Sequence, residues 1–133
     1  MKFFFDRWTK TETAIFLREA LGEDIIHHDE IFPRRTDDVV WLPWAAEENR
    51  YVFTHDEVIH RNKEQKRVIY QSRNVVFILP VYGMSAWERF ELFVLSYPYV
   101  KRAIAENPPP KPSVYRIPKR GLRTTNIKKH RKL

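Results

Sequence analysis

Three aspartates occupy positions where one metal ion could bind them together. Asp6 directly follows an aromatic run at residues 2–5, and Asp56 follows a second apolar run at residues 51–54. Asp38 opens a segment with the pattern of a helix. Carboxylate oxygens are preferred ligands of Mg²⁺ and Mn²⁺, and such an ion can activate water and stabilise charge on a phosphate. The chemistry open to these residues is therefore phosphodiester hydrolysis.

The elements around these aspartates determine whether they can meet. The short apolar runs that precede Asp6 and Asp56 are typical of strands buried on both faces. Strands that alternate with helices predict an α/β fold with a mostly parallel sheet and helices on both faces. In such a sheet ligands bind at the carboxyl ends of the strands, where the following helices begin. Asp6, Asp38 and Asp56 are therefore expected to converge on one edge.

The remaining segments continue the alternation of strands and helices. Thr9 and Glu12 form a capping-box pattern, and Gly22 has the position of a helix C-cap, so a helix is expected between them. Further strands are expected at residues 24–28, 75–79 and 114–117, and further helices at 36–49, 62–71 and 85–105. Pro43 and Pro98 lie inside two of these helices and predict kinks. We expect four to five strands in all.

Each aspartate also has a simpler interpretation. Asp37 or Asp38 has the position of a helix N-cap, whose side-chain oxygen accepts backbone N–H groups. Asp56 could cap a turn. Asp6 is hardest to explain in this way, because a carboxyl behind a buried strand is costly without a partner or a function. The spacing by itself leaves the structural and the catalytic interpretations open.

Other catalytic chemistries find less support in the composition. His27, His28, His55 and His60 could form a transition-metal site, but no pair has the helical His-Glu-x-x-His spacing. The serines show no nucleophile-elbow pattern. The chain has three glycines and no cysteine, which argues against glycine-rich phosphate loops and excludes thiolate chemistry. Metal-bound carboxylates remain the strongest candidates.

The positive charge of the chain is concentrated near its C-terminal end. Nine of the 24 Lys and Arg residues lie in residues 111–133, which contain no acid, whereas residues 1–110 carry a net charge of −2. We therefore expect a domain at 1–110 and a basic extension at 111–133 that binds the phosphates of nucleic acid. An effect on solubility alone is the alternative. The four cationic side chains that cluster at the end are Lys128, Lys129, Arg131 and Lys132.

Two expectations concern mobility and location. Residues 128–132 are expected to be mobile, because neighbouring cations repel and no local acid pairs with them. No stretch approaches the roughly 18 apolar residues that a membrane span requires, and the first charges come too early for a signal peptide. We therefore expect a soluble protein of the cytoplasm without a membrane partner.

Several short motifs follow one another in an order typical of a known family. The main motifs are Phe3 to Asp6, Asp38 to Pro43 and Val52 to Asp56. The stretches from Asp56 to Glu64 and from Ser85 to Glu88 add to this order. Together they resemble the compact PIN-like domains related to VapC toxins, over roughly residues 2 to 105.

The resemblance implies a three-layer α/β fold, a Mg²⁺ or Mn²⁺ site and ribonuclease activity on single-stranded RNA. It implies that Asp6, Asp38 and Asp56 are catalytic, metal-binding acids, and we count the adjacent Asp37 with the metal ligands. It also implies a small antitoxin protein as partner, and a homodimer stays open.

The resemblance also bears on the residues that would contact RNA. Arg61 and Asn62 correspond to the polar pair beside the site, and we expect them and Arg7 to contact RNA. Arg7 departs from the family, because relatives often have asparagine after the first aspartate. Its fixed charge could occupy the space that a metal needs. A PIN-like module that holds RNA or a protein without cutting is therefore the alternative function. An unrelated α/β nuclease or phosphatase that uses the same acids is a third.

Overall fold

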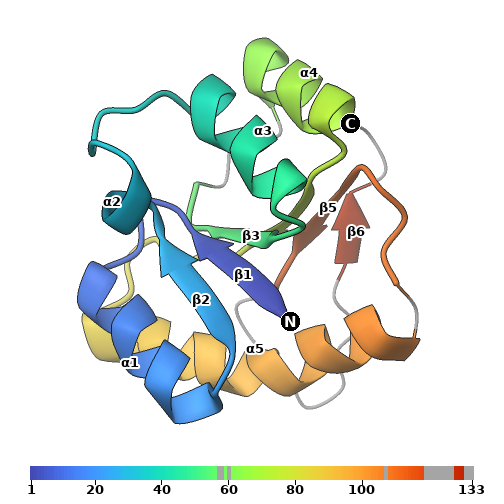
Figure 1. Cartoon of the computed structure of the whole chain (residues 1–133). Coiled ribbons are helices and arrows are strands. Elements are labelled where there is room, and N and C mark those ends of the chain that lie inside the picture. The colour runs from blue at the N-terminus through green and yellow to red at the C-terminus, as the bar shows by residue number, and fades with distance from the viewer. Residues whose placement is uncertain (57–58, 60, 107, 119–127, 131–133) are drawn as a thin grey trace.

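The computed structural model describes residues 1–56, 59, 61–106, 108–118 and 128–130 (Figure 1). Its helices are α1 (Thr11–Leu21), α2 (His28–Ile31), α3 (Asp38–Glu47), α4 (Lys63–Ser72) and α5 (Ala86–Glu106). Its strands are β1 (Lys2–Phe5), β2 (Asp24–His27), β3 (Tyr51–Thr54), β4 (Val75–Ile78), β5 (Ser113–Arg116) and β6 (Lys128–His130). Strands and helices alternate along most of the chain, as the sequence predicts.

The strands form one sheet in the order β2-β1-β3-β4-β5-β6. The first five strands are parallel, and β6 pairs antiparallel with β5. The expected α/β fold with a mostly parallel sheet is confirmed. The sequence had indicated four to five strands, and the additional strand is β6.

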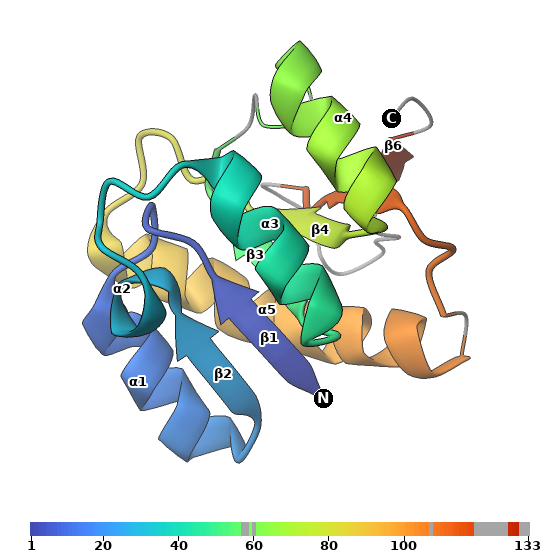
Figure 2. The same ribbon diagram turned by 45° about the horizontal axis from the view of Figure 1, so that its top comes forward.

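Helices cover both faces of the sheet, which gives three layers (Figures 1 and 2). Alternate side chains of β1 point to opposite faces, because the side-chain period of a strand is two residues. Phe3 and Phe5 pack with residues of α1 and α5, including Leu17 and Phe93. Phe4 packs on the other face with residues of α3 and α4. The sheet is therefore buried on both faces, as its continuous apolar strands predict.

One local prediction needs correction, and one short helix was not predicted. Helix α1 begins at Thr11 without a side-chain cap, and the Thr9 hydroxyl donates to the carbonyl oxygen of Asp6 at 2.8 Å. The expected capping box is therefore wrong at its first residue. Pro98 lies within α5, which is not split there and runs from Ala86 to Glu106, and the expected kink stays a prediction. Helix α2 was not predicted, and a capping box at its start pairs the side chains of His27 and Glu30 with each other's backbone.

The segment expected to be a basic extension contributes to the sheet. Strand β5 lies beyond residue 110 and pairs with β4 in parallel. Lys128–His130 forms β6, which the sequence had not predicted, and the mobility expected of residues 128–132 stays a prediction. Residues 131 and 132 lie outside the described residues. None of the described helices is long and apolar enough to cross a membrane.

Candidate metal and nucleic-acid site

The three aspartates of the sequence analysis lie at one edge of the sheet. Asp6 follows the last residue of β1, Asp56 lies two residues beyond β3, and Asp38 is the first residue of α3. Because β1 and β3 are parallel neighbours, their carboxyl ends lie together, and α3 begins at the same edge (Figure 2). The charges of Asp38 and Asp56 act on Asp6 directly. The structure thus brings together the three residues that the spacing had singled out.

Asp6 is the most buried of the three carboxyl groups, with 2% of the residue exposed. Its Oδ2 accepts a hydrogen bond from Thr54 Oγ1, and its Oδ1 accepts the backbone N–H of Trp8 at 3.0 Å. Burial, together with smaller contributions from the negative charges of Asp38 and Asp56, raises the pKa of Asp6 to about 7 despite these bonds. The ionised form therefore lacks charge compensation in this conformation.

Thr54 connects two of the acids. While its hydroxyl donates to Asp6, its Oγ1 also accepts the backbone N–H of Asp56 at 3.0 Å. The side chain is fully buried at the last position of β3. One hydroxyl thus orients the Asp6 carboxylate and fixes the turn that carries Asp56.

Asp38 is held by groups from three parts of the chain. Trp41 Nε1 donates to its Oδ1 at 2.9 Å, and Gln65 Nε2 from α4 donates to its Oδ2. Arg7 Nη1 lies 3.6 Å from the same Oδ1. Burial raises the pKa of Asp38, while the Arg7 charge and the Trp41 bond oppose that rise. Asp38 therefore already has a cationic neighbour.

Arg7 has a second contact that holds its guanidinium group beside Asp38. Its Nη1 also donates to the carbonyl oxygen of Thr36, in the loop before α3. About a quarter of the Arg7 side chain is exposed, at 27%. The guanidinium group therefore stands where the sequence had placed a fixed charge, next to the acids, and it pairs with Asp38.

The other predicted site residues have structural roles or lie at the surface. Asp37 is exposed and is the N-cap of α3, with its Oδ1 accepting the N–H of Asp38 at 3.0 Å. Asn62 caps α4 and accepts the N–H groups of Glu64 and Gln65 at 3.0 and 3.1 Å. Arg61 is exposed. The sequence had left the cap as one interpretation of Asp37, and the geometry supports it.

The tail residues expected to bind nucleic acid fall into two groups. Lys128 and Lys129 lie in β6, at the sheet end opposite β2, and their backbones pair with Arg116 and Tyr115. Arg131 and Lys132 lie outside the described residues.

His27 and His28 take part in capping and packing, and His60 lies outside the described residues. The His27 side chain accepts the N–H of Asp29, and His28 Nδ1 lies 2.8 Å from Asp29 Oδ1. Burial and the charge of Arg89 lower the pKa of His55 to about 4. Within the part of the chain that the structure describes, no three His, Asp or Glu side chains form a ready metal cage.

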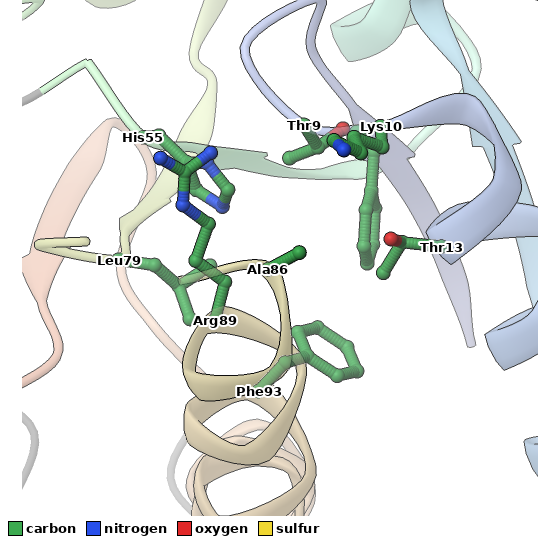
Figure 3. A pocket seen from close by; sticks show the side chains of 9 residues that line it. Thr9, Lys10, Thr13, His55, Leu79, Ala86, Arg89 and Phe93 are labelled. Carbon is green, nitrogen blue, oxygen red and sulfur yellow. The ribbon is translucent and has the colours of Figure 1, made fainter. Parts of the chain in front are cut away.

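Two hollows adjoin the acids. The larger, with a volume of about 490 Å³, opens beside Asp56 and is lined by Trp8, His55, Asp56, Val81, Tyr82, Gly83 and Arg89. The smaller, of about 30 Å³, is mostly apolar and is lined by residues that include Phe5, Thr13 and Phe93. Figure 3 shows this smaller pocket, with His55 and Arg89 together on one side and Thr9, Lys10 and Thr13 on the other. His55 and Arg89 line both hollows.

A comparison with protein families shows which family the chain belongs to. The family model of the PIN like domain matches residues 1–81, which include all three acids and β1 to β4. The chain belongs to the PIN-like domain family. PIN domains are generally nucleases. No curated protein and no solved structure matches the chain.

The carboxylate oxygens of the three acids in this PIN-like domain are the kind of ligand that a hard divalent cation prefers. Mg²⁺ and Mn²⁺ take oxygen ligands, and they often bind only one or two protein carboxylates while water and phosphate complete the shell. The raised pKa of Asp6 marks a carboxylate that a cation would stabilise in its ionised form. Small side-chain movements would be needed, since Arg7 now pairs with Asp38.

Three residues of the site were not predicted from the sequence. The acids accept hydrogen bonds from the side chains of Thr54, Trp41 and Gln65. In the local sequence each of these residues fits the pattern of an ordinary strand or helix. Thr54 carried the only available signal, a hydroxyl at the end of a strand of otherwise apolar residues. Gln65 lies 27 positions from Asp38, so only tertiary structure pairs them.

Proposed function

We propose that this PIN-like domain is a Mg²⁺- or Mn²⁺-dependent endoribonuclease that cleaves single-stranded RNA. The observation that carries the proposal is the buried Asp6 carboxyl, with a pKa raised to about 7, in electrostatic contact with Asp38 and Asp56. Such clusters are costly unless a cation compensates them, and strongly perturbed acids are typical of functional sites.

Asp6, Asp38 and Asp56 would hold the metal. The bound ion would lower the pKa of a water molecule and stabilise negative charge on the scissile phosphate. The chain's own groups keep the acids in place: Thr54 orients Asp6, and Trp41 and Gln65 orient Asp38.

Arg7 has a second role in this proposal. In the structure it compensates Asp38 at 3.6 Å. When a metal takes over that compensation, the guanidinium group becomes available for an RNA phosphate, for which its planar donors are well suited. Arg61 and the tail residues Lys128, Lys129, Arg131 and Lys132 add positive charge for RNA binding.

We further propose that the domain is the toxin of a toxin–antitoxin pair in the cytoplasm, with a small antitoxin protein as its inhibitor. Expression in a bacterial host should then arrest growth, and Asp6→Asn should relieve the arrest. Growth arrest of equal depth with both chains would exclude RNA cleavage as its cause.

The nuclease is tested by incubating the purified protein with single-stranded RNA and Mn²⁺. Asp6→Asn should reduce cleavage by at least 100-fold, because the substitution removes a ligand charge from the metal site. The matched control is Glu47→Gln, which neutralises an exposed acid at the other end of α3. Cleavage that survives Asp6→Asn would identify a contaminant and exclude the assignment.

The Arg7–Asp38 pair specifically favours a second function, a PIN-like module that binds RNA or a protein without cutting. A guanidinium group that stays on Asp38 would keep a metal out. Calorimetric titration with Mn²⁺ separates the two functions. Binding that depends on Asp56 supports the nuclease, whereas RNA binding without any Mn²⁺ binding supports the module.

A further inference from the structure

The larger hollow beside Asp56 combines two exposed aromatic rings with one cation. Trp8 is 57% exposed and Tyr82 is 86% exposed, and both line it. Large aromatic side chains are usually buried more deeply, so two exposed rings around one concave surface indicate a binding site. Arg89 lines the same hollow from α5.

Arg89 is positioned to receive an anion. Its Nε donates to the carbonyl oxygen of Met84 at 3.3 Å, which fixes the direction of the side chain. Among the described residues, no carboxylate forms an ion pair with it. A guanidinium group held in this way can present its terminal nitrogens to a phosphate.

The hollow borders one of the three acids and lies next to a second. Asp56 is part of its lining, and the backbone N–H of Trp8 donates to Asp6 at 3.0 Å. A ligand that lay against Trp8 would therefore reach the edge where Asp6 and Asp56 meet. The volume of about 490 Å³ lies within the range of roughly 300–1,000 Å³ that is usual for small-molecule sites.

We propose that this hollow binds one unstacked nucleotide of single-stranded RNA, with its base against Trp8 and Tyr82 and a phosphate on Arg89. Aromatic rings stack with any base, and a base is available for stacking only where the strand is not paired. Asp56 repels phosphate, which places the phosphate on the Arg89 side and the base between the rings. The inference rests on the proposed function, because a nucleotide bound in the hollow would place the neighbouring phosphate of the RNA at the acids.

The site makes the domain selective for single strands. In an A-form duplex the bases are stacked inside, and neither Trp8 nor Tyr82 could reach a base face without opening the helix. The preference for single-stranded RNA would then come from this hollow, while the acids act on whichever phosphate is delivered to them.

The test measures RNA binding in EDTA, so that cleavage plays no part. Fluorescence anisotropy of a labelled eight-nucleotide single strand gives the affinity for the full chain. Trp8→Ala should weaken binding by about 5- to 100-fold, which corresponds to the loss of stacking with one base. Trp8→Phe keeps a ring and should restore most of the affinity. Arg89→Gln should weaken binding and lower the slope of log affinity against log salt by about 0.7.

Two matched controls change the same residue types outside the hollow. Trp87 is 68% exposed and stacks on Phe90, and Trp87→Ala should leave the affinity within about twofold. Arg102 is an exposed cation in α5, and Arg102→Gln controls for the loss of charge. Trp8 is mostly exposed, so its removal should not prevent folding, which circular dichroism will check.

The outcomes separate this site from the nuclease. Trp8-dependent binding of single strands supports the site even if no cleavage is found with Mn²⁺, in which case only the nuclease fails. Equal affinities of the wild type and Trp8→Ala, or equal affinities for single-stranded and duplex RNA, would overturn the site even if cleavage is found. In the former case the hollow would instead be a candidate surface for a peptide partner.

Discussion

Asp6 is a buried carboxyl whose ionised form destabilises the fold. It is enclosed behind β1, and its hydrogen bonds with Thr54 and Trp8 do not offset the loss of water around the ionised group. Natural proteins tolerate such groups mainly where a ligand or a reaction needs them. The cost should be measurable in the metal-free protein.

We predict that the Asp6 carboxyl destabilises the metal-free protein progressively as the pH rises from about 4 to about 7. The folded-state pKa of Asp6, about 7, lies above its ordinary value of 3.8, so the folded protein binds the proton more tightly than the unfolded chain. Asp6→Asn removes this dependence. At pH 8 the variant should be more stable by up to about 4 kcal/mol, and at pH 4 the two should be similar.

Urea unfolding of both proteins in EDTA at pH 4, 6 and 8 provides the measurement. Titratable groups that do not interact with Asp6 contribute equally to both profiles, so the difference between the profiles reports Asp6 together with its coupling to Asp38 and Asp56. Added Mn²⁺ should stabilise the wild type and not the variant, because a ligand that binds only the folded state raises stability by mass action. Parallel pH profiles would show that the Asp6 carboxyl is ionised without penalty.

Arg7 would compete with a metal for Asp38, because its guanidinium group already pairs with that carboxylate. We predict that Arg7→Gln increases Mn²⁺ affinity about fivefold, because a competing charge 3.6 Å from Asp38 Oδ1 is removed. RNA affinity should fall in the same variant, since the guanidinium group is a proposed phosphate contact. Calorimetry with Mn²⁺ and anisotropy with RNA measure the two effects.

The control for Arg7 is Arg34→Gln, which removes a guanidinium group that pairs with Asp29 at 2.9 Å. Its Mn²⁺ affinity should equal that of the wild type. Weaker Mn²⁺ binding in Arg7→Gln would mean that Arg7 supports the acids rather than competing with a cation.

Among the elements, helix α3 determines where one of the three acids lies. Its first residue is Asp38, and its N-cap is Asp37. Asp37 therefore fixes where the helix starts, and Asp38 consequently faces the acids of β1 and β3. The positive end of the helix dipole also lies at this point and favours negative charge there.

We predict that Asp37→Ala lowers the stability of the protein by about 1 kcal/mol and leaves Mn²⁺ affinity within twofold. The decrease arises because the N–H of Asp38 no longer has its side-chain acceptor. Asp38→Asn is the matched comparison and should abolish Mn²⁺ binding. A tenfold drop in Mn²⁺ affinity with Asp37→Ala would instead make Asp37 a ligand, as the sequence had suggested.

The distribution of charge matters at the scale of the whole molecule. The net charge of −2 over residues 1–110 contrasts with nine cations and no acids over residues 111–133. An acidic active edge repels RNA at long range, and a basic segment offsets that repulsion. Since Lys128–His130 is paired with β5, removing the segment would also remove a strand. Charge neutralisation is therefore a cleaner test than truncation.

We predict that changing Lys128, Lys129, Arg131 and Lys132 together to Gln weakens RNA binding and flattens its salt dependence. The slope of log affinity against log salt should fall by about 0.7 for each RNA phosphate that the variant no longer neutralises. The cleavage-site preference should stay unchanged, because binding to phosphates carries no sequence information. Affinity measured across a salt series tests the first effect, and sequencing of the products tests the second.

The double variant Lys101→Gln and Arg102→Gln, in the exposed part of α5, controls for a general loss of charge. An unchanged salt slope in the tail variant would exclude the tail from RNA binding. The segment would then be a candidate binding surface for an acidic antitoxin.

Local sequence patterns predicted where most strands and helices lie, and they singled out the three acids at the ends of these elements. Continuous apolar runs predicted β1, β3 and β4, because a strand buried on both faces needs no alternation. The parallel topology then placed Asp6, Asp38 and Asp56 on one edge. Gly22 was predicted as the C-cap of α1, and its left-handed φ of 67° confirms it.

Only the tertiary structure decided how those acids are held. The bonds of Asp6 with Thr54, of Asp38 with Gln65, and of Arg7 with Asp38 join residues 27 to 48 positions apart or across separate elements. Local propensity carries no information about such partners. The same holds for β6, because its run of basic residues has no strand pattern and its backbone pairs with β5 only in the folded chain. The hollow between Trp8, Tyr82 and Arg89 likewise depends on tertiary structure, because the sheet brings the loops after β1, β3 and β4 and the start of α5 together at one edge.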